Sequence, residues 1–282
     1  MPTARLNVAV LGVGLIGGSI GFAARTRAGA RVSGWDPDPG VRARALQRGA
    51  LDMAADDIAG AVAGADVVFV AAPVGALAQT ARAALENAGA ETVVTDVGST
   101  KRIVAEAISD RRFVGGHPLA GSQESGVEHA RADLFDGAVW YLAASPGAHP
   151  ALERLIGEFG AQAVPIDPER HDRLMATVSH LPHVLANLLI AQAGACIGED
   201  ASPLATGPSF RDATRVAGSN SAIWTDIYMS NRDALIAAID ELTGRLAQVR
   251  AVLETGEAQA VRDWNERARS QRETLLGPID ER

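Results

Sequence analysis

Residues 12–17 read Gly12-Val13-Gly14-Leu15-Ile16-Gly17 and come directly after the apolar run Leu6–Leu11. A glycine-rich turn between an apolar strand and a helix, here expected over Gly17–Ala28, is typical of a site for the pyrophosphate of a dinucleotide. In such a turn the first glycine makes the bend, the second lets the phosphates approach the backbone, and the third lets helix and strand pack closely. The sequence therefore predicts a bound dinucleotide contacted by Gly12, Gly14, Leu15, Ile16 and Gly17.

An acidic residue follows the second expected strand. This strand, Arg31–Trp35, ends at Asp36, where a carboxylate can accept hydrogen bonds from the hydroxyls of the adenine ribose. Because no arginine follows immediately to bind a 2′-phosphate, we expect NAD rather than NADP. Pro73, at the end of the β-branched run Asp66–Ala72, is a further expected cofactor contact. The alternative is a glycine-rich turn with a solvated aspartate.

The composition is that of an ordinary soluble globular protein. The 282 residues are 47% apolar and 21% charged, and the net charge of −8 argues against a surface for nucleic acid. Cys196 is the single cysteine, so no internal disulfide can form, which fits a reducing compartment. Leu6–Leu11 is too short to cross a bilayer, and no secretory leader is recognisable. We expect a cytoplasmic protein that binds neither nucleic acid nor membrane.

The chain divides by pattern into two parts. Residues 1–166 alternate short apolar runs with helical stretches, which predicts βαβ units. The later strands are expected over Thr92–Asp96, Phe113–Gly116, Val139–Ala143 and Gln162–Ile166. Beyond Pro168 the pattern is helical, over Glu169–Gly198, Arg232–Glu254 and Glu257–Leu276. The fold class is therefore α/β, with a Rossmann-type doubly wound dinucleotide-binding domain (1–166) followed by an all-helical domain (167–282).

The first long helix of the second part is more apolar than one buried face requires. The residues in question are Leu185, Leu188, Leu189 and Ile190. Either a neighbouring subunit covers some of them, or all of them fill a core within the domain.

Two polar motifs follow neighbouring strands and are candidates for proton chemistry. Asp96-Val97-Gly98-Ser99 follows one strand, and the next leads into Gly115-Gly116-His117-Pro118-Leu119-Ala120-Gly121. Ligands of a doubly wound sheet bind beyond the carboxyl ends of its strands, so Ser99 and His117 are expected near the cofactor. A neutral imidazole suits the removal of a hydroxyl proton as hydride leaves. Ser99 can also be the N-cap of a helix that starts at Lys101.

The helical part contains a histidine pair, in Ser179-His180-Leu181-Pro182-His183. Pro182 is expected to bend or break the helix, and His180 and His183 share a face because they are three residues apart. Two histidines without a carboxylate or cysteine make a poor metal site, so we expect no metal. Contact with a substrate and a purely structural helix-breaking role remain equally open.

An arginine cluster follows, in Phe210-Arg211-Asp212-Ala213-Thr214-Arg215, with Trp224 further on. Arginine is the natural bidentate partner of a carboxylate. The alternative is that both arginines are solvated surface charges.

Taken together, these motifs identify a family. The chain resembles the prephenate and arogenate dehydrogenases of tyrosine biosynthesis over essentially its whole length. The glycine motif occurs in many dehydrogenases, whereas the four motifs around Ser99, His117, His183 and Arg215 are specific to this family in their order and spacing. The resemblance implies an active site between a dinucleotide-binding domain and a helical dimerisation domain, and hence a homodimer. The implied reaction is oxidative decarboxylation of prephenate to 4-hydroxyphenylpyruvate, or of arogenate to tyrosine.

The resemblance also implies roles for single residues. His117 would take the proton of the ring hydroxyl, with Ser99 orienting both groups. Arg215 would bind a substrate carboxylate, with Asp212 holding the guanidinium. His183 and Trp224 would line the substrate pocket, while His180 and His171 would support the region between the domains.

The substrate itself depends on Ser122-Gln123, where both side chains are expected to meet it. Some members of the family carry an acid at the place of Gln123, which can pair with the ammonium group of arogenate. A neutral glutamine cannot, and this favours prephenate, with arogenate or dual specificity as the alternative. A β-hydroxyacid dehydrogenase would need a catalytic lysine in the helical half, but the sole lysine is Lys101. A non-enzymatic NAD sensor would not need a proton acceptor beside a carboxylate anchor.

Overall fold

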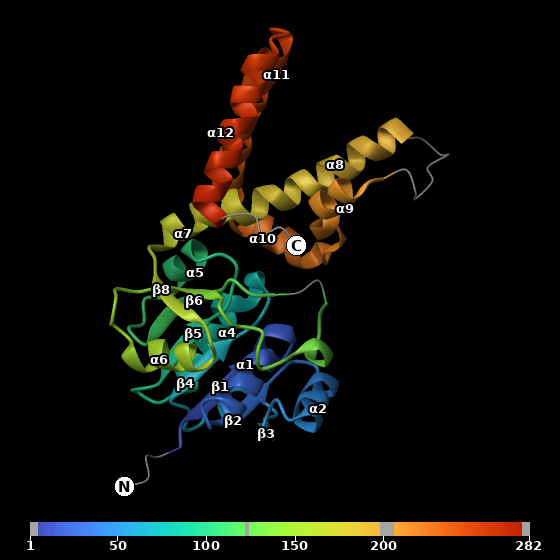
Figure 1. The fold of residues 1–282 in the computed structure, drawn as a ribbon. Helices are drawn as coiled ribbons and strands as arrows, with labels where there is room; N and C mark the ends of the chain where they lie inside the picture. The colour runs from blue at the N-terminus through green and yellow to red at the C-terminus, as the bar shows by residue number, and fades with distance from the viewer. Residues whose placement is uncertain (1–4, 122–123, 198–205, 278–282) are drawn as a thin grey trace. The chain divides into compact units, whose positions relative to one another are not determined.

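The computed structural model describes residues 5–121, 124–197 and 206–277. By the density of contacts the chain forms two compact units, residues 1–235 and 236–282. All of the sheet, and every residue discussed as a site below, belongs to the first unit (Figure 1).

The first unit is built on one sheet of eight strands in the order β3-β2-β1-β4-β5-β6-β7-β8. The strands are β1 (Asn7–Leu11), β2 (Arg31–Trp35), β3 (Met53–Ala54), β4 (Val67–Val70), β5 (Val93–Asp96), β6 (Phe113–Pro118), β7 (Val139–Ala143) and β8 (Gln162–Pro165). The strands from β3 to β6 pair in parallel, β7 is antiparallel to β6, and β8 is parallel to β7. The predicted α/β class is confirmed, and β3 is a short strand that the sequence analysis missed.

Helices connect the strands and then take over the chain. In the sheet region they are α1 (Leu15–Thr26), α2 (Pro39–Arg48), α3 (Ile58–Val62), α4 (Val74–Asn87), α5 (Arg102–Ala107) and α6 (Pro150–Glu158). After β8 follow α7 (Pro168–Met175), α8 (Leu181–Ile197), α9 (Pro208–Thr214), α10 (Ser221–Ser230), α11 (Arg232–Glu254) and α12 (Ala258–Leu276). Short 3₁₀ turns lie at Val127–His129 and Arg215–Gly218.

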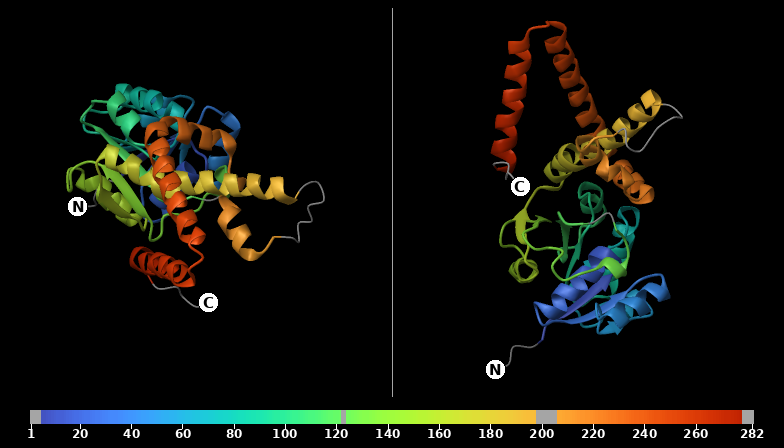
Figure 2. Two further views of the ribbon diagram at one scale, coloured as in Figure 1. Left: turned by 90° about the horizontal axis from the view of Figure 1, so that it is seen from above. Right: turned by 45° about the vertical axis from the view of Figure 1, so that its right-hand side comes forward.

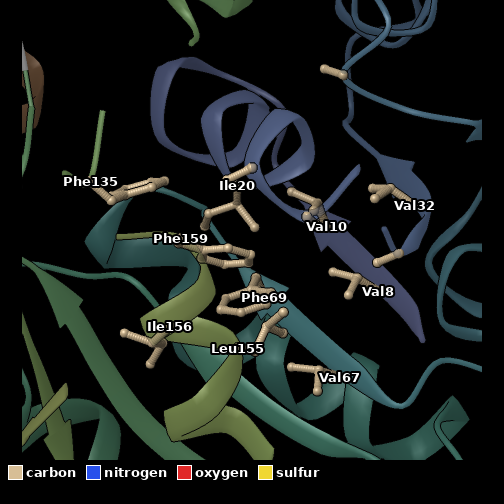
Figure 3. Close-up of a cluster of buried hydrophobic side chains, with 14 of the residues drawn as sticks. Val8, Val10, Ile20, Val32, Val67, Phe69, Phe135, Leu155, Ile156 and Phe159 are labelled. Atoms are coloured by element: carbon tan, nitrogen blue, oxygen red, sulfur yellow. The ribbon is translucent and has the colours of Figure 1, made fainter. Parts of the chain in front are cut away.

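Two hydrophobic cores lie on opposite faces of the sheet, because successive side chains of a strand point to opposite sides. In β1, Val8 and Val10 belong to the core that contains α1 and α6 side chains such as Ile20 and Leu155 (Figure 3). Ala9 and Leu11 belong to the core formed with α3, α4 and α5. The central strands are therefore buried on both faces, which explains their continuous apolar runs.

The helix that carries the histidine pair continues through Pro182, so the predicted break is absent, whereas the bend that was the other expected outcome stays a prediction. A π-helical turn over Ala176–His180 joins α7 to α8, and the amide of Leu181 donates to the carbonyl of Ala176. Proline removes one donor from the helix. The wider turn just before it shifts the hydrogen-bond register and lets the helix continue.

Helix α8 leaves apolar side chains uncovered. Leu188, Leu189 and Ile190 are 58%, 42% and 47% exposed, so they do not fill a core within the described part of this chain. By length and composition alone, the helix Pro168–Cys196 could cross a membrane, and 33% of its most apolar window is buried in the protein. Core helices of soluble proteins meet the same criterion, so this is weak evidence for a span.

The second unit, residues 236–282, contains most of α11 and all of α12 (Figure 2). Ion pairs four residues apart support both helices, for example Arg245–Glu241 and Arg269–Glu273. Several large apolar side chains on them are exposed, namely Leu246, Leu253, Leu275 and Leu276.

Candidate active site

The polar motifs of the first half gather at one edge of the sheet. Strands β2, β1, β4, β5 and β6 lie side by side and run parallel, so their carboxyl ends meet at the same edge. In this order they bring Asp36, the glycine turn, Pro73, Ser99 and His117 into a row. From β1 the chain builds the sheet first on one side, with β2 and β3, and then on the other, with β4, β5 and β6. In such folds a dinucleotide binds beyond the carboxyl ends of the strands, at the point where this direction changes.

The glycine turn is closed to side chains at two positions and open at a third. Gly12 has φ +89°, a left-handed conformation, and a Cβ there would overlap the carbonyl oxygen of Ala71. A Cβ at Gly17 would overlap the carbonyl oxygen of Gly12. At Gly14 a Cβ would meet no protein atom within 4 Å, so this backbone faces open space.

The turn also presents the start of α1 to that space. Gly14 is the N-cap, no side chain caps the helix there, and the first turn contains no acidic residue. The carboxylate of Asp36 accepts hydrogen bonds from the amides of Val13 (2.9 Å) and Asp38 (3.0 Å). These groups fit a dinucleotide, with Asp36 at the ribose and the free amides at the pyrophosphate.

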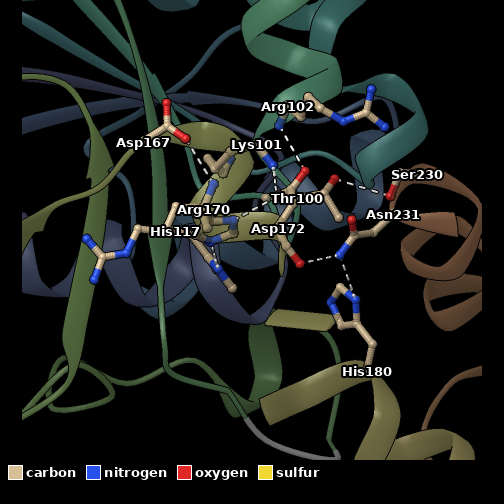
Figure 4. A network of polar contacts seen from close by, with 12 residues as sticks. Thr100, Lys101, Arg102, His117, Asp167, Arg170, Asp172, His180, Ser230 and Asn231 are labelled. Atoms are coloured by element: carbon tan, nitrogen blue, oxygen red, sulfur yellow. Dashed lines mark hydrogen bonds and ion pairs between the residues drawn. The ribbon is translucent and has the colours of Figure 1, made fainter. Parts of the chain in front are cut away.

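At the other end of the row, His117 is the first member of a chain of hydrogen bonds. Nδ1 of His117 lies 2.9 Å from Nε2 of His171 in α7, and Nδ1 of His171 lies 2.8 Å from Oδ1 of Asp172. Figure 4 labels His117 and Asp172, the two ends of this chain. A carboxylate can only accept, so Nδ1 of His171 donates to Asp172. A His171 ring with no proton on Nε2 would accept there, so His117 would donate from Nδ1 and keep its lone pair on Nε2.

Asp172 links three segments of the chain. Its carboxylate accepts from the backbone amides of Lys101 (2.7 Å) and Arg102 (3.0 Å) and so caps α5. Its own carbonyl accepts from the side-chain amide of Asn231 (2.7 Å), which also contacts Nδ1 of His180 (3.2 Å). Helix α7 is held in place at its start by Asp167, which accepts from the amide of Arg170.

A buried ion pair lies behind His117. The ammonium group of Lys101 contacts Oδ2 of Asp96, and the two side chains are 1% and 0% exposed. Asp96 also accepts from the amides of Gly98 and Gly116, both at 2.9 Å, so it ties the Ser99 loop to β6. Burial lowers the pKa of His117 well below its usual value, and the neighbouring His171, Lys101 and His180 lower it further. The imidazole is therefore neutral at pH 7.

Ser99 does not have the local role that its position indicated. Helix α5 begins at Arg102 with Lys101 as N-cap and no side-chain cap, so the N-cap prediction for Ser99 is wrong. Asp172, from a distant part of the chain, supplies the carboxylate that serves as cap. In the described residues no hydrogen bond joins Ser99 to His117, whose Nδ1 partner is His171 instead.

The histidine pair is brought together with aromatic residues of α10. The ring of His183 stacks on Trp224 with centroids 3.7 Å apart and planes 5° apart, and its Nδ1 contacts the hydroxyl of Tyr228. His180 meets the edge of Trp224 at 6.2 Å. Burial lowers the pKa of His180 to about 4, and it also lowers the pKa of His183. Both rings are thus neutral at pH 7.

Arg215 and Asp212 lie on the surface of this unit, at the start of a 3₁₀ turn and on α9. Both are exposed and no ion pair connects them among the described residues, so the support of Arg215 by Asp212 stays a prediction. Ser122 and Gln123 lie outside the described residues. Within the described ranges no group of three His, Cys, Asp or Glu side chains is arranged to hold a metal ion.

Sequence reasoning missed Asp172, Asn231 and Tyr228. The sequence contains little that indicates a role for Asp172. It is adjacent to His171 in a helix, where neighbouring side chains usually point in different directions. The amides that it binds lie about seventy positions earlier in the chain. Tyr228 was detectable, since it lies one helical turn after Trp224 on the same face. A surface cavity of about 270 Å³ near Arg82 and Arg112 lies at the opposite edge of the sheet, and Arg112 is already bonded there to Asp110.

Comparison with known proteins agrees with this geometry. Residues 20–159 match the family described as prephenate dehydrogenase, nucleotide-binding domain, and residues 167–266 match the prephenate dehydrogenase dimerization domain. A prephenate dehydrogenase of Bacillus subtilis (strain 168) is 34% identical over 288 residues, covering 95% of this chain and 76% of that protein. A cyclohexadienyl dehydrogenase of Zymomonas mobilis is 32% identical over 260 residues, covering 88% of each.

A solved structure has the same fold throughout. The prephenate dehydrogenase from A. aeolicus, in complex with hydroxyphenyl propionate and NAD⁺, has a TM-score of 0.88 and 26% identity. The match covers 98% of this chain and 100% of that one. The chain, with its nucleotide-binding α/β domain and its helical region, belongs to the prephenate dehydrogenase family.

Proposed function

We propose that this chain catalyses the NAD-dependent oxidative decarboxylation of prephenate to 4-hydroxyphenylpyruvate, a step of tyrosine biosynthesis. The observation that carries the proposal is a neutral His117 whose Nδ1 lies 2.9 Å from Nε2 of His171, which leaves Nε2 of His117 as the ring nitrogen for the substrate. This base lies at the same sheet edge as the glycine turn. A dehydrogenase needs this combination of a proton acceptor and a dinucleotide site.

The cofactor would lie along the row of strand ends. Gly12, Gly14 and Gly17 would hold the pyrophosphate, with Leu15 and Ile16 at the start of α1, Asp36 at the adenine ribose and Pro73 towards the nicotinamide. When bound, the nicotinamide ring accepts the hydride. NAD is favoured over NADP because the Asp36 carboxylate would repel a 2′-phosphate.

The glycines allow this site to be tested apart from turnover. Gly14→Ala is expected to leave the unfolding midpoint in urea nearly unchanged, because the new methyl group meets no protein atom. It should weaken NADH binding about tenfold or more, because the methyl group fills the space proposed for the phosphates. Gly17→Ala, the matched variant, overlaps the Gly12 carbonyl and should cost about 1–3 kcal/mol of folding stability. Unchanged NADH binding in Gly14→Ala would count against the cofactor placement.

The chemistry then requires alignment and one proton acceptor. His117 Nε2 takes the proton of the ring hydroxyl as the carbinol carbon loses hydride, and the carbonyl that forms accepts the electrons of the departing carboxylate. Aromatisation of the ring drives the step, so the enzyme needs few other groups. Ser99, at the neighbouring strand end, would contact the same hydroxyl.

The substrate would be held by the helical segments. Arg215 would bind the side-chain carboxylate, because a cation fixed on the ring carboxylate would oppose its loss as carbon dioxide. The exposure of Arg215 and its lack of an ion pair among the described residues leave its guanidinium available. Other substrate contacts are proposed for Asp212, His180, His183 and Trp224, and for Ser122 and Gln123.

The same family membership supports proposals about assembly and location. We propose a domain boundary between residues 166 and 167, and the family matches over residues 20–159 and 167–266 support it. The helical part would form a homodimer, which would cover the exposed Leu188, Leu189 and Ile190 of α8. A soluble dimer with a single cysteine fits the cytoplasm.

The second candidate activity is the oxidation of arogenate, and the cyclohexadienyl dehydrogenase relative favours keeping it. The deciding experiment measures NADH or NADPH formation with prephenate, with arogenate and with neither, each with NAD and NADP. We expect the highest kcat/KM with prephenate and NAD. Gln123→Glu is expected to raise kcat/KM for arogenate relative to prephenate, since the new acid can pair with the ammonium group. No turnover of either acid would refute the proposed function.

A further inference from the structure

We propose that His171, with its proton on Nδ1 alone, and Asp172 are positioning residues, which hold His117 as its Nδ1–H tautomer and so fix Nε2 as the atom that removes the proton. The kinetic part of this inference rests on the proposed function. The structural part, the protonation of a given ring nitrogen in the free protein, does not depend on the substrate.

The direction of the hydrogen-bond chain follows from its last member. Asp172 is 2% exposed, and its carboxylate accepts from three donors, namely His171 Nδ1 and the amides of Lys101 and Arg102. Burial alone would raise the pKa of this carboxyl, but those hydrogen bonds outweigh burial and keep the pKa below its usual value. An ionised carboxylate cannot donate, so Nδ1 of His171 donates to Asp172. With that single proton on the His171 ring, as proposed, Nε2 of His171 accepts and His117 donates from Nδ1.

His171 has no freedom to turn away from this arrangement. It is fully buried, its ring contacts Tyr141 edge-on at 5.6 Å, and both of its nitrogens are engaged. The carboxylate is equally fixed, because it caps α5. His117 is the remaining member of the hydrogen-bond chain, and its backbone is held in β6 by pairing with Tyr141 in β7.

The charged and titratable groups that face His117 are His171 from α7, Lys101 from the start of α5 and His180 from the π-helical turn. Lys101 is paired with Asp96, so the only anion directly in the histidine chain is Asp172. A neutral His117 with an unassigned proton would populate both tautomers, and one of them carries a hydrogen on the atom that must act as base. The pair His171–Asp172 removes that second tautomer.

Two substitutions of His171 separate positioning from packing. The amide of asparagine lies near the place of Nδ1, so His171→Asn keeps a donor for Asp172 but loses the acceptor for His117. The amide of glutamine reaches the place of Nε2, so His171→Gln keeps an acceptor for His117 but loses the bond to Asp172. Both leave one buried partner without its bond, and their unfolding midpoints should fall by similar amounts.

The test without substrate is nitrogen NMR on the full chain with ¹⁵N-labelled histidine. The signal of His117 is found by its absence in His117→Asn, among six histidines. At pH 7 we expect a protonated Nδ1 and an unprotonated Nε2 in the wild type and in His171→Gln. His171→Asn should show a mixture with increased Nε2–H. A wild-type His117 protonated on Nε2, or on both nitrogens, overturns the inference whatever the substrate proves to be.

The test with substrate compares kcat and KM for prephenate and NAD. His171→Asn is expected to lose about 10–100-fold in kcat with little change in KM, because part of the general-base contribution is lost. His171→Gln should stay within about fivefold of the wild type. Equal losses in the two variants, following their loss of stability, would show that His171 acts only in packing. If the wild type turns over neither substrate, the proposed function fails while the NMR result still decides the tautomer.

Discussion

His117→Asn is expected to lower kcat for prephenate by about 10²–10⁴-fold, the usual contribution of general acid–base catalysis. The asparagine amide can still donate to Nε2 of His171 from a place near the lost Nδ1, so the buried partner keeps its hydrogen bond. What disappears is the basic Nε2. Steady-state kcat and KM at saturating NAD measure the effect, with NADH binding and the urea midpoint as controls. Full turnover by this variant would remove His117 from the mechanism.

The pH dependence of kcat/KM in the wild type is a second test of the role of His117. Burial, together with the neighbouring His171, Lys101 and His180, lowers the pKa of His117 well below its usual value of 6.5. The base must be unprotonated, so kcat/KM should stay level as the pH falls through 6.5 and decline only at more acidic values. A midpoint of the acid limb at or above pH 6.5 would contradict this environment.

Arg215→Ala is expected to raise KM for prephenate about 10–100-fold with a smaller loss in kcat. A charge-assisted hydrogen bond to a carboxylate contributes about 1.5–3 kcal/mol, and each 1.4 kcal/mol is a factor of ten in binding. An interaction made equally in the bound substrate and in the transition state changes KM rather than kcat. The side chain is exposed, so folding stability should change by less than about 0.5 kcal/mol.

Arg211→Ala is the matched control, because Arg211 is also exposed and lies one helical turn earlier in the chain. Its KM should stay within about twofold of the wild type, as for an ordinary surface substitution. Equal KM values in Arg215→Ala and the wild type, or equal increases in both variants, would show that the side-chain carboxylate is bound elsewhere.

Much of the fold was predictable, because local signals determine it. The apolar run before Gly12 and the glycines after it indicate a strand, a turn and a helix, and the two close approaches at Gly12 and Gly17 show why no other residue type fits. The parallel pairing of the strands then brings Asp36, Ser99 and His117 to one edge, as expected from the general rule for such sheets.

The partner of His117 was not predictable in the same way. Ser99 was a reasonable cap and a reasonable neighbour by its place in the chain. The carboxylate that caps α5 comes from Asp172 instead, and the imidazole that meets His117 comes from His171. Both contacts join segments more than fifty positions apart, and a single sequence contains no signal for pairings of that range. The same holds for the π-helical turn, because the effect of Pro182 depends on how the preceding turn adjusts.

The buried pair of Lys101 and Asp96 has a practical consequence for handling this protein. Lys101 carries the only ε-amino group in the sequence, and it is 1% exposed. Reagents that acylate amines therefore find no accessible lysine on the native fold. Acylation of Lys101 requires the segment around the proposed active site to open, so the rate of acylation measures this local opening. Because the sequence contains no other lysine, no surface lysine reacts in parallel. A covalent label at Lys101, located by the mass of its peptide, thus follows the motion of the part of the protein where the chemistry is proposed to occur.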